Sequence, residues 1–439
     1  MDNSRIFVGL DIGSTQIKVI AGQRDGRGVT AIGTATVPSN GLKQGVIVDI
    51  DQTAQAIQRA VLETQEKSNF QIVDLVVGLP ANQLEIRPAQ GVVSVSNPEK
   101  RITFDEIFSV TRQALGQSLS SDREVVAFDV DEFIVDGFNG IKDPHDMVGV
   151  RLEVRGTSYI GSRTIVENIR MAVAKAGLQI NQLVLTPLTL GSTILNESEQ
   201  EFGTVIVDMG GDQTTASVIH NSKLKFTYVD SEGGDDVTRD ISEVLHTSMS
   251  NAEKLKRDYG FADASQASKQ EQVVVTAIDG SQPKQISQNY LSEIIQAREE
   301  QIFNDILKAL TQAKALEMPG GIILTGGAAA MPRISDLAKK IFNKEIKLFI
   351  PDQIGLRHPA YTRSLSYVSY ASKLTQTEQV INKALENLNG NNQMQQPQAS
   401  NANQMQPNSN TNQISNNQKA SSSQKLTDRI KNLFQSFFD

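Results

Sequence analysis

The chain of 439 residues contains no cysteine, which removes several classes of protein at once. Disulfide bonds, thiol catalysis and cysteine-ligated zinc are excluded. Histidine is scarce, and no histidine has a second histidine or a carboxylate in motif spacing, so we expect no transition-metal site. We interpret the four histidines as ordinary surface or core side chains: His145, His220, His246 and His358.

Long apolar runs are also missing. No uninterrupted run approaches the roughly 18 residues that indicate a transmembrane helix. The N-terminus lacks a signal-peptide pattern, so we expect neither a membrane span nor export. The net charge is −8 and there is no long basic run, which argues against nucleic acid as the main partner. The length allows more than one hydrophobic core.

Three apolar, strand-like runs each lead into a glycine-rich turn. They are Ile6–Leu10 before DIGST, Thr204–Val207 before DMGGD, and Ile322–Thr325 before GGA. Glycine permits tight turns and lets backbone N–H groups approach phosphate oxygens without side-chain obstruction. One such turn is most often an ordinary loop. Three in this order indicate a nucleotide-binding cleft built from two similar halves.

Charged side chains accompany the first two turns. Asp11 and Asp208 lie at the ends of their strands, where they would face the phosphates from two sides. Their carboxylate oxygens could hold a hydrated Mg²⁺ ion. Lys18 follows Asp11 by seven residues and can supply a point charge to a phosphate oxygen. The residues expected at the phosphates are Gly13, Ser14, Thr15, Gln16, Lys18, Gly210, Gly211, Asp212 and Thr214.

The sequences of these turns resemble those of the actin, Hsp70 and sugar-kinase superfamily. DIGSTQIKV and DMGGDQTTASV are similar to its two phosphate motifs, and GGIILTGGAA to its adenosine motif. Two further stretches, Asp136–Val154 and Gly177–Leu195, resemble the FtsA family of bacterial cell-division proteins. This resemblance runs from about residue 5 to 385 and again at the C-terminus. It implies an α/β, actin-like, two-lobed ATPase fold.

The pattern of strand-like and helix-like segments changes at about residue 83. Before it, strand-like runs and the amphipathic stretch Asp51–Lys67 form an α/β pattern. After it come strand-like Gly91–Ser96, Glu124–Val135 and Met147–Val154 with the helix-like Phe104–Gln117, which we interpret as an inserted α+β subdomain. The resemblance then gives the first core as residues 1–82, 163–202 and 357–388, the insertion as 83–162, the second core as 203–229 and 310–356, and a polar, helical lid as 230–309.

The lid and the second core carry the residues expected near the adenosine. Glu253 and Lys256 are three residues apart, so a helix places both on one face. An ordinary solvated salt pair on a helix surface has the same spacing, so spacing alone does not identify a binding site. The segment resembles the adenosine-contacting helix of the superfamily. Met331 can pack on the adenine or belong to the core. Gly233 and Gly234 resemble a turn over the phosphates, and the adenosine turn supplies Gly326, Gly327 and Ala328.

The second phosphate motif departs from the superfamily pattern D-x-G-G-G-T. Asp212 stands at the third glycine position, followed by Gln213. A carboxylate beside phosphates repels them unless a cation lies between. Asp212 therefore either turns outward or alters metal binding and hydrolysis. Asp11, Asp208 and Gln213 are the candidates to orient an attacking water, so ATP binding is better supported than ATP turnover.

After Leu388 the composition becomes rich in asparagine, glutamine and serine, which predicts a disordered linker at 389–424. A linker of roughly 35 residues reaches about 30 to 35 Å. Residues 425–439 then form an amphipathic pattern with an apolar arc of roughly 140°. Basic side chains flank this arc, which is typical of a helix at an anionic membrane surface; docking on a protein groove remains open. The membrane residues are Leu426, Arg429, Ile430, Lys431, Leu433, Phe434, Phe437 and Phe438.

The resemblance to FtsA implies a function in cell division. It implies self-association into an actin-like filament, attachment to the cytoplasmic face of the membrane at the septum, and contacts with other division proteins. The implied partner is the C-terminal tail of the tubulin-like protein FtsZ, bound near Arg298. A pilus-assembly adaptor and a sugar kinase of the same fold are the alternatives. An Hsp70-type chaperone would need a substrate domain where this chain has low-complexity sequence.

Overall fold

The structure is a computed structural model that describes residues 5–25, 28–97, 99–278 and 282–394. The chain forms two compact units. The first comprises Met1–Asp236 and Ile302–Leu388, and the second is built around Val237–Gln301. The expected lid at 230–309 is thus wider than the second unit at both ends.

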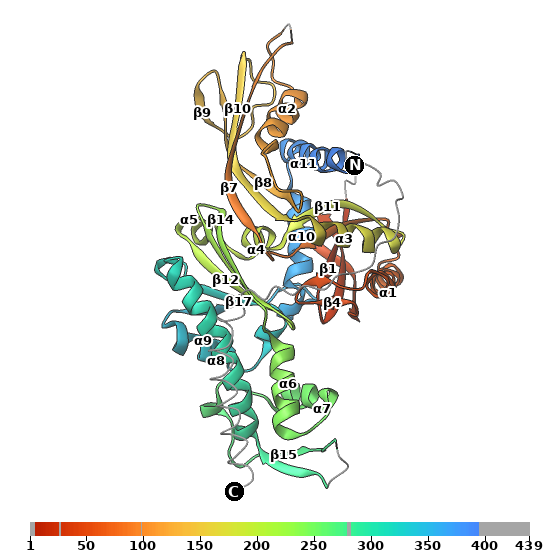
Figure 1. The fold of residues 1–439 in the computed structure, drawn as a ribbon, viewed down its shortest axis with the longest axis vertical. Helices are drawn as coiled ribbons and strands as arrows, with labels where there is room; N and C mark the ends of the chain where they lie inside the picture. Colours follow the sequence, from red (N-terminus) through yellow and green to blue (C-terminus); the bar gives the residue numbers. More distant parts are fainter. Residues whose placement is uncertain (1–4, 26–27, 98, 279–281, 395–439) are drawn as a thin grey trace, which may run out of the picture. The chain divides into compact units, whose positions relative to one another are not determined.

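Two five-stranded sheets of the first unit share one topology, and Figure 1 labels some of the strands of each. In each, a hairpin continues into a third antiparallel strand, and its first strand pairs in parallel with a strand from later in the chain. The first sheet has the order β11(Gln179–Leu185)-β6(Asp74–Leu79)-β1(Ile6–Ile12)-β2(Gln16–Asp25)-β3(Gly28–Pro38). The second has the order β18(Ile346–Leu348)-β17(Ile322–Thr325)-β12(Thr204–Met209)-β13(Thr214–His220)-β14(Lys223–Asp230).

The first sheet contacts helices α1, α3, α4 and α10. Helix α1 (Ile50–Ser68) begins at Asp49, whose side chain accepts a hydrogen bond from the Gln52 amide, and ends where Asn69 adopts a left-handed conformation. Its buried Ile57 joins a core that also contains Leu10 of β1. The other helices are α3 (Arg163–Lys175), α4 (Thr186–Ile194), α10 (Thr362–Lys373), and, with contacts to the second sheet, α5 (Glu197–Phe202) and α9 (Ile334–Phe342).

The inserted region forms a four-stranded antiparallel sheet. Its order is β7(Glu85–Ser94)-β10(Arg151–Ser162)-β8(Arg123–Val135)-β9(Phe138–Ile141), and α2 (Phe104–Leu115) packs on it. The expectation of a strand at Met147–Val154 was partly wrong, because β10 begins at Arg151 and continues to Ser162. The preceding segment instead turns back on residues 100–102 through backbone hydrogen bonds.

The last described helix, α11 (Gln376–Met394), differs from the expectation in two ways. It packs on the inserted sheet rather than the first core, since Ile381 lies in a cluster with Phe133 and Leu152, and Leu385 lies in one with Val125 and Ile160. Figure 1 shows it beside α2. The helix also continues through residues 389–394, so the expected start of the linker at 389 was too early. Residues 395–424 of that linker and the predicted helix 425–439 lie outside the described residues.

The second unit combines helices with a short antiparallel sheet that the sequence did not predict. Its sheet pairs β15 (Gln272–Val275) with β16 (Lys284–Ser287). Helix α7 (Met249–Tyr259) lies within the unit, whereas α6 (Gly234–Leu245) and α8 (Gln288–Gln312) extend beyond its bounds. None of the helices in the described ranges combines the length and apolar character needed to cross a membrane.

Candidate nucleotide-binding site

The first two glycine turns have the same backbone geometry. Gly13 lies between β1 and β2, and Gly210 lies between β12 and β13. A Cβ atom on Gly13 would lie 2.7 Å from the carbonyl oxygen of Gln16, and one on Gly210 would lie 2.7 Å from that of Gln213. Each turn therefore folds back so closely on its fourth residue that only glycine fits. The repeated topology of the two sheets thus ends in a repeated turn.

The two turns also contact each other. A Cβ atom on Gly211 would lie 1.9 Å from Oγ1 of Thr15, so the first turn fills the space in front of this glycine. Thr15 Oγ1 donates a hydrogen bond to Oδ2 of Asp235 at 2.9 Å. The amides of Gly234 and Asp235 donate to the carbonyls of Gly210 and Gly211, at 3.0 and 2.7 Å. The predicted Gly233-Gly234 turn therefore packs directly on the second phosphate turn.

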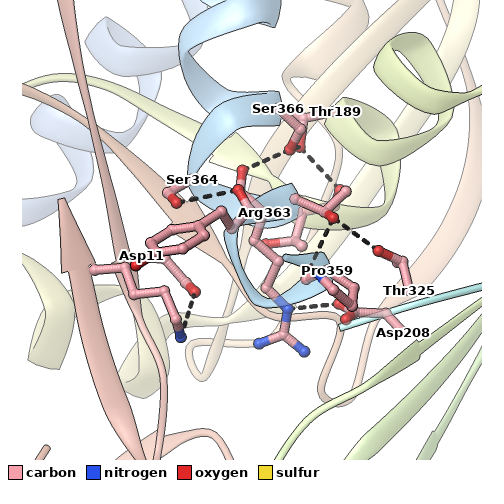
Figure 2. A network of polar contacts seen from close by, with 12 residues as sticks. Asp11, Thr189, Asp208, Thr325, Pro359, Arg363, Ser364 and Ser366 are labelled. Atoms are coloured by element: carbon pink, nitrogen blue, oxygen red, sulfur yellow. Dashed lines mark hydrogen bonds and ion pairs between the residues drawn. The ribbon is translucent and has the colours of Figure 1, made fainter. Parts of the chain in front are cut away.

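Two ion pairs with buried carboxylates flank these turns. Asp11 lies opposite Lys18 across the β1–β2 hairpin, with Oδ2 and Nζ 3.9 Å apart. Asp208 Oδ2 lies 2.5 Å from Nε of Arg363, a residue that was not predicted to belong to the site. Figure 2 shows the side chain of Arg363 between Asp11 and Asp208. Arg363 lies in the segment 357–388 that was assigned to the first core. No sequence motif marks it as a site residue.

Burial and neighbouring charges shift the pKa values of three groups: Asp11, Lys18 and Arg363. Burial raises the pKa of Asp11, and Lys18 and Arg363 oppose that rise. Burial lowers the pKa of Lys18, with Asp11 acting against it. Burial disfavours the charged form of Arg363 as well, but Asp208 and Asp11 outweigh it and raise the pKa of Arg363. Arg363 is thus a fixed cation in the centre of the site.

The donor set fits a hydrated magnesium ion rather than direct coordination. Oδ1 of Asp208 is buried and accepts no hydrogen bond from any described residue. Such an oxygen can accept a hydrogen bond from a metal-bound water, and Asp11 provides a second carboxylate nearby. Across the described ranges, no three carboxylate, histidine or cysteine side chains gather closely enough to hold an ion by themselves.

A small hairpin covers the two phosphate turns. Strands β4 (Leu42–Lys43) and β5 (Val46–Ile47) are joined by Gln44 and Gly45, which both have positive φ angles. The Gln44 amide donates a short hydrogen bond to Asp212, and the Gly45 amide donates to Oγ of Ser14 at 3.0 Å. Burial raises the pKa of Asp212, the Gln44 amide opposes the rise, and Asp235 and Asp236 add to it. Asp212 therefore points toward the hairpin.

Gln213 is held beneath the same hairpin. Its side chain is buried, and its Oε1 accepts a hydrogen bond from Nδ2 of Asn82 at 3.3 Å. Gly45 approaches it so closely that a Cβ atom there would lie 2.6 Å from Oε1. Thr214, the last predicted phosphate residue, is buried and donates to the carbonyl oxygen of Glu232 at 3.0 Å. Gln213 thus has a fixed orientation beside the phosphate turns.

The third glycine turn abuts the second. Gly326 has a φ of 93°, and a Cβ atom on it would lie 2.6 Å from Oδ1 of Asp208. Gly327 and Ala328 continue into the short 3₁₀ helix η3 (Ala328–Ala330). Met331 follows this helix and is half-buried. The Ile322–Thr325 strand therefore delivers its turn next to Asp208, as the sequence pattern indicated.

Within the second unit, Glu253 and Lys256 form a tight pair on α7. Lys256 Nζ lies 2.7 Å from Oε2 of Glu253 and donates to Oγ1 of Thr238 at 2.7 Å. Burial raises the pKa of Glu253, but Lys256 and Thr238 outweigh it and the net pKa is lowered. Lys256 is only 8% exposed, so the pair is not an ordinary solvated one. Thr238 was not selected from the sequence.

Arg298 is engaged within the second unit. Its Nε and Nη2 donate to the two carboxylate oxygens of Asp240, at 2.7 and 2.8 Å. Both side chains are largely buried. The adjacent Glu299 is fully buried, and burial raises its pKa to about 7 against the charges of Lys256 and Arg298. A carboxylate on a partner would therefore have to compete with Asp240 for Arg298.

Comparison with known proteins agrees with this geometry. A family model described as cell division protein FtsA matches residues 205–366, and one described as the SHS2 domain inserted in FtsA matches residues 81–160. The cell division protein FtsA of Enterococcus hirae is 48% identical over 88% of this chain and 87% of its own length. The chain belongs to the FtsA family. Another relative, FtsA of Bacillus subtilis, is 37% identical over 85% of each chain.

Solved structures agree on the fold. MreB5 of Spiroplasma citri bound to ADP has a TM-score of 0.52 and 14% identity, covering 88% of this chain and all of the MreB5 chain. A protein of the PilM-PilN type IV pilus biogenesis complex has a TM-score of 0.58 and 15% identity, covering 84% of this chain and 99% of the other. At such identity these likenesses show the fold alone. The chain is an actin-like cell-division protein with an inserted SHS2 domain.

Proposed function

We propose that this FtsA-family chain binds ATP, with the phosphates between the Gly13 and Gly210 turns. The observation that carries the proposal is the pair of equivalent turns that face each other through Thr15 and Gly211. Their backbone N–H groups, with Lys18, form the kind of cradle that polyphosphates require. This chain shares the fold of MreB5, and the solved structures of MreB5 bound to ADP and AMPPNP support the proposal that the chain binds a nucleotide.

Magnesium would be held through water by Asp11 and Asp208. It would neutralise phosphate charge at the place where the unpartnered Oδ1 of Asp208 lies. If hydrolysis occurs, Asp11, Asp208 and Gln213 are the residues that would orient the attacking water. Gln213 suits this role because Asn82 fixes its side chain. The arrangement supports binding more directly than turnover.

The adenosine would be contacted by two groups of residues. Glu253 and Lys256 would meet the ribose and the base, and Met331 would pack on the adenine. The backbone of Gly326, Gly327 and Ala328 would approach the nucleotide closely, and Gly233 and Gly234 would close over its phosphates. The buried, mutually paired state of Glu253 and Lys256 supports a positioned polar contact rather than a solvated salt pair.

We further propose that the chain assembles into actin-like filaments on the cytoplasmic face of the membrane at the division septum. The amphipathic sequence at 425–439 would attach each subunit, with its apolar side chains in the acyl boundary. A single short helix binds weakly, because burial at the interface is partial and the helix must be ordered on binding. Filament assembly would convert many weak attachments into a firm one.

The proposed protein partner is the C-terminal tail of FtsZ, so that the filament links FtsZ to the membrane and recruits other division proteins. Arg298 would receive a carboxylate of the tail, in competition with Asp240. The variant Asp240→Asn would weaken this competition, and Arg298→Ala would remove the cation. We expect a labelled FtsZ tail peptide to bind more tightly to D240N and more weakly to R298A, as measured by fluorescence anisotropy. Equal affinity of all three proteins would refute the role of Arg298.

Vesicle co-sedimentation tests the membrane function. The full chain and a chain ending at Met394 are each mixed with anionic vesicles, with and without Mg-ATP. This end keeps α11 complete, unlike a cut at Leu388. We expect truncation to abolish binding and ATP to strengthen it for the full chain only. Equal sedimentation of both chains would refute the terminal helix as the anchor, and an absence of any ATP effect would refute the coupling of assembly to attachment.

A further inference from the structure

Arg363 is placed by the same strands that hold Asp208. Thr325 pairs with Asp208 across β17 and β12. Thr325 Oγ1 donates to Oγ1 of Thr362 at 2.8 Å, and Thr362 Oγ1 donates to the carbonyl oxygen of Pro359 at 2.8 Å. These bonds fix the first turn of α10, and Arg363 is its second residue (Figure 2). The position of the guanidinium is therefore tied to the second phosphate turn.

Asp208 accepts a hydrogen bond from only one of the donor groups of the Arg363 guanidinium. Nε donates to Asp208 Oδ2, and in the described part of the chain no partner accepts from Nη1 or Nη2. Nη2 lies 3.5 Å from the position that a Cβ atom on Gly210 would take. The side chain keeps 19% of its surface exposed. Arginine carries five N–H donors in a planar fork, so several donors remain available beside the phosphate turn.

Several carboxylates gather at the two turns. Asp11, Asp208, Asp212 and Asp235 all lie at or beside them, and Lys18 is already opposite Asp11. A triphosphate entering this acidic site is repelled unless cations neutralise it. Arg363 is a permanent, covalently attached cation at this place, because a guanidinium remains charged at every accessible pH. It can therefore supply charge that other sites obtain from a bound metal ion.

We propose that Arg363 is a phosphate-binding residue that holds Asp208 through Nε and a nucleotide phosphate through its Nη groups. It thereby replaces part of the charge neutralisation by Mg²⁺, so that ATP binding persists when the divalent cation is removed. This inference rests on the proposed binding of ATP. It assigns to α10 a direct role in nucleotide recognition, and it makes the length and planarity of the arginine side chain necessary.

The test compares ATP, ADP and adenosine binding to the full chain by titration calorimetry, in Mg²⁺ and in EDTA. The variants are Arg363→Gln, which removes the charge, and Arg363→Lys, which keeps the charge but replaces the planar fork of five donors with a compact ammonium of three. We expect R363Q to lose roughly ten- to a hundred-fold in ATP affinity in EDTA, the effect of one charged hydrogen-bonding group. The loss in Mg²⁺ is smaller, and adenosine binding is unchanged. R363K falls between R363Q and the unaltered chain.

The outcomes separate three interpretations. An equal loss of ATP affinity with and without Mg²⁺, or an equal loss for adenosine, overturns the inference and leaves Arg363 as a structural link between α10 and β12. Circular dichroism melting identifies a variant that has lost its fold, and R363K then carries the comparison. If the unaltered chain binds no ATP under either condition, the proposed function itself fails. If it binds ATP only in Mg²⁺, the proposed function stands and the role of Arg363 is refuted.

Discussion

Thr15 donates a hydrogen bond to Asp235, 220 residues later in the chain, with Oγ1 and Oδ2 2.9 Å apart. This bond joins the first phosphate turn to the start of α6, and it passes directly in front of Gly211. The hydroxyl group of Thr15 is therefore a direct link between the two halves of the phosphate site. The arrangement leaves no room for a side chain at Gly211.

Gly211→Ala should separate the two phosphate turns. The new methyl group would lie 1.9 Å from Oγ1 of Thr15, and the hydroxyl cannot move without losing Asp235. We expect ATP affinity, measured by titration calorimetry, to fall at least about ten-fold, as for the loss of one charged hydrogen bond. Gly390→Ala is the matched control, because no atom lies within 4 Å of its added methyl group. Unchanged affinity of G211A would show that ATP does not lie between the turns.

Asp212→Asn should strengthen ATP binding. The asparagine keeps an oxygen for the Gln44 amide but removes a negative charge from the phosphate turn. Two unit charges 4 Å apart in water interact by about 1 kcal/mol, so we expect a gain of roughly five-fold, reduced by added salt. Asp105→Asn, on an exposed surface of the inserted domain, controls for net charge. A lower affinity of D212N in Mg²⁺ alone would instead show that Asp212 assists the metal.

The ion pair between Arg298 and Asp240 should stabilise the second unit through its burial. Removing one partner leaves the other charge buried and unpaired, which costs up to about 3 to 5 kcal/mol. We expect Arg298→Ala and Asp240→Ala each to lower the free energy of unfolding, measured by urea denaturation with circular dichroism. The double variant should lose less than the sum of the two. Strict additivity would show that the two side chains do not interact in solution.

The elements with strong local patterns were predicted closely from the sequence. The strand Ile6–Leu10 became β1 with two further residues, and the helix Asp51–Lys67 became α1 with one further residue at each end. Both segments have a hydrophobic period or run that one packing environment explains. The actin-like fold is confirmed by the solved structures, and the family by its relatives. The glycine turns were found because close backbone approach leaves a local sequence trace.

Features formed between distant segments were not predictable. Arg363 pairs with a residue 155 positions earlier, and no spacing in the sequence encodes that contact. The pairing of Arg298 with Asp240 was missed for the same reason. The β4–β5 hairpin has only two residues in each strand, too few for a detectable alternation. Its hydrogen bonds to Ser14 and Asp212 explain where the unusual Asp212 points.

Glu299 should make the second unit less stable as the pH rises. Burial of the carboxyl group raises its pKa in the folded chain to about 7, from an ordinary value of 4.5. Between these values the unfolded chain has released the proton while the folded chain still holds it. Stability is therefore fully present below about pH 4.5 and is lost as the pH rises through 7. The shift corresponds to an upper limit of about 3 kcal/mol.

Glu299→Gln removes the titration while keeping the shape of the side chain. Because the buried charge at high pH is then absent, we expect the variant to be more stable than the unaltered chain at pH 8 and little changed at pH 5. Urea denaturation of the full chain at both pH values, followed by circular dichroism, measures the difference. Glu293→Gln, exposed on the same helix, is the control and should show no such dependence. If E299Q stabilises equally at both pH values, the gain comes from packing or hydrogen bonding rather than from the charge. If it destabilises at pH 8, the ionised carboxylate is held favourably by Lys256 and Arg298, and the sign of the predicted pH dependence is wrong.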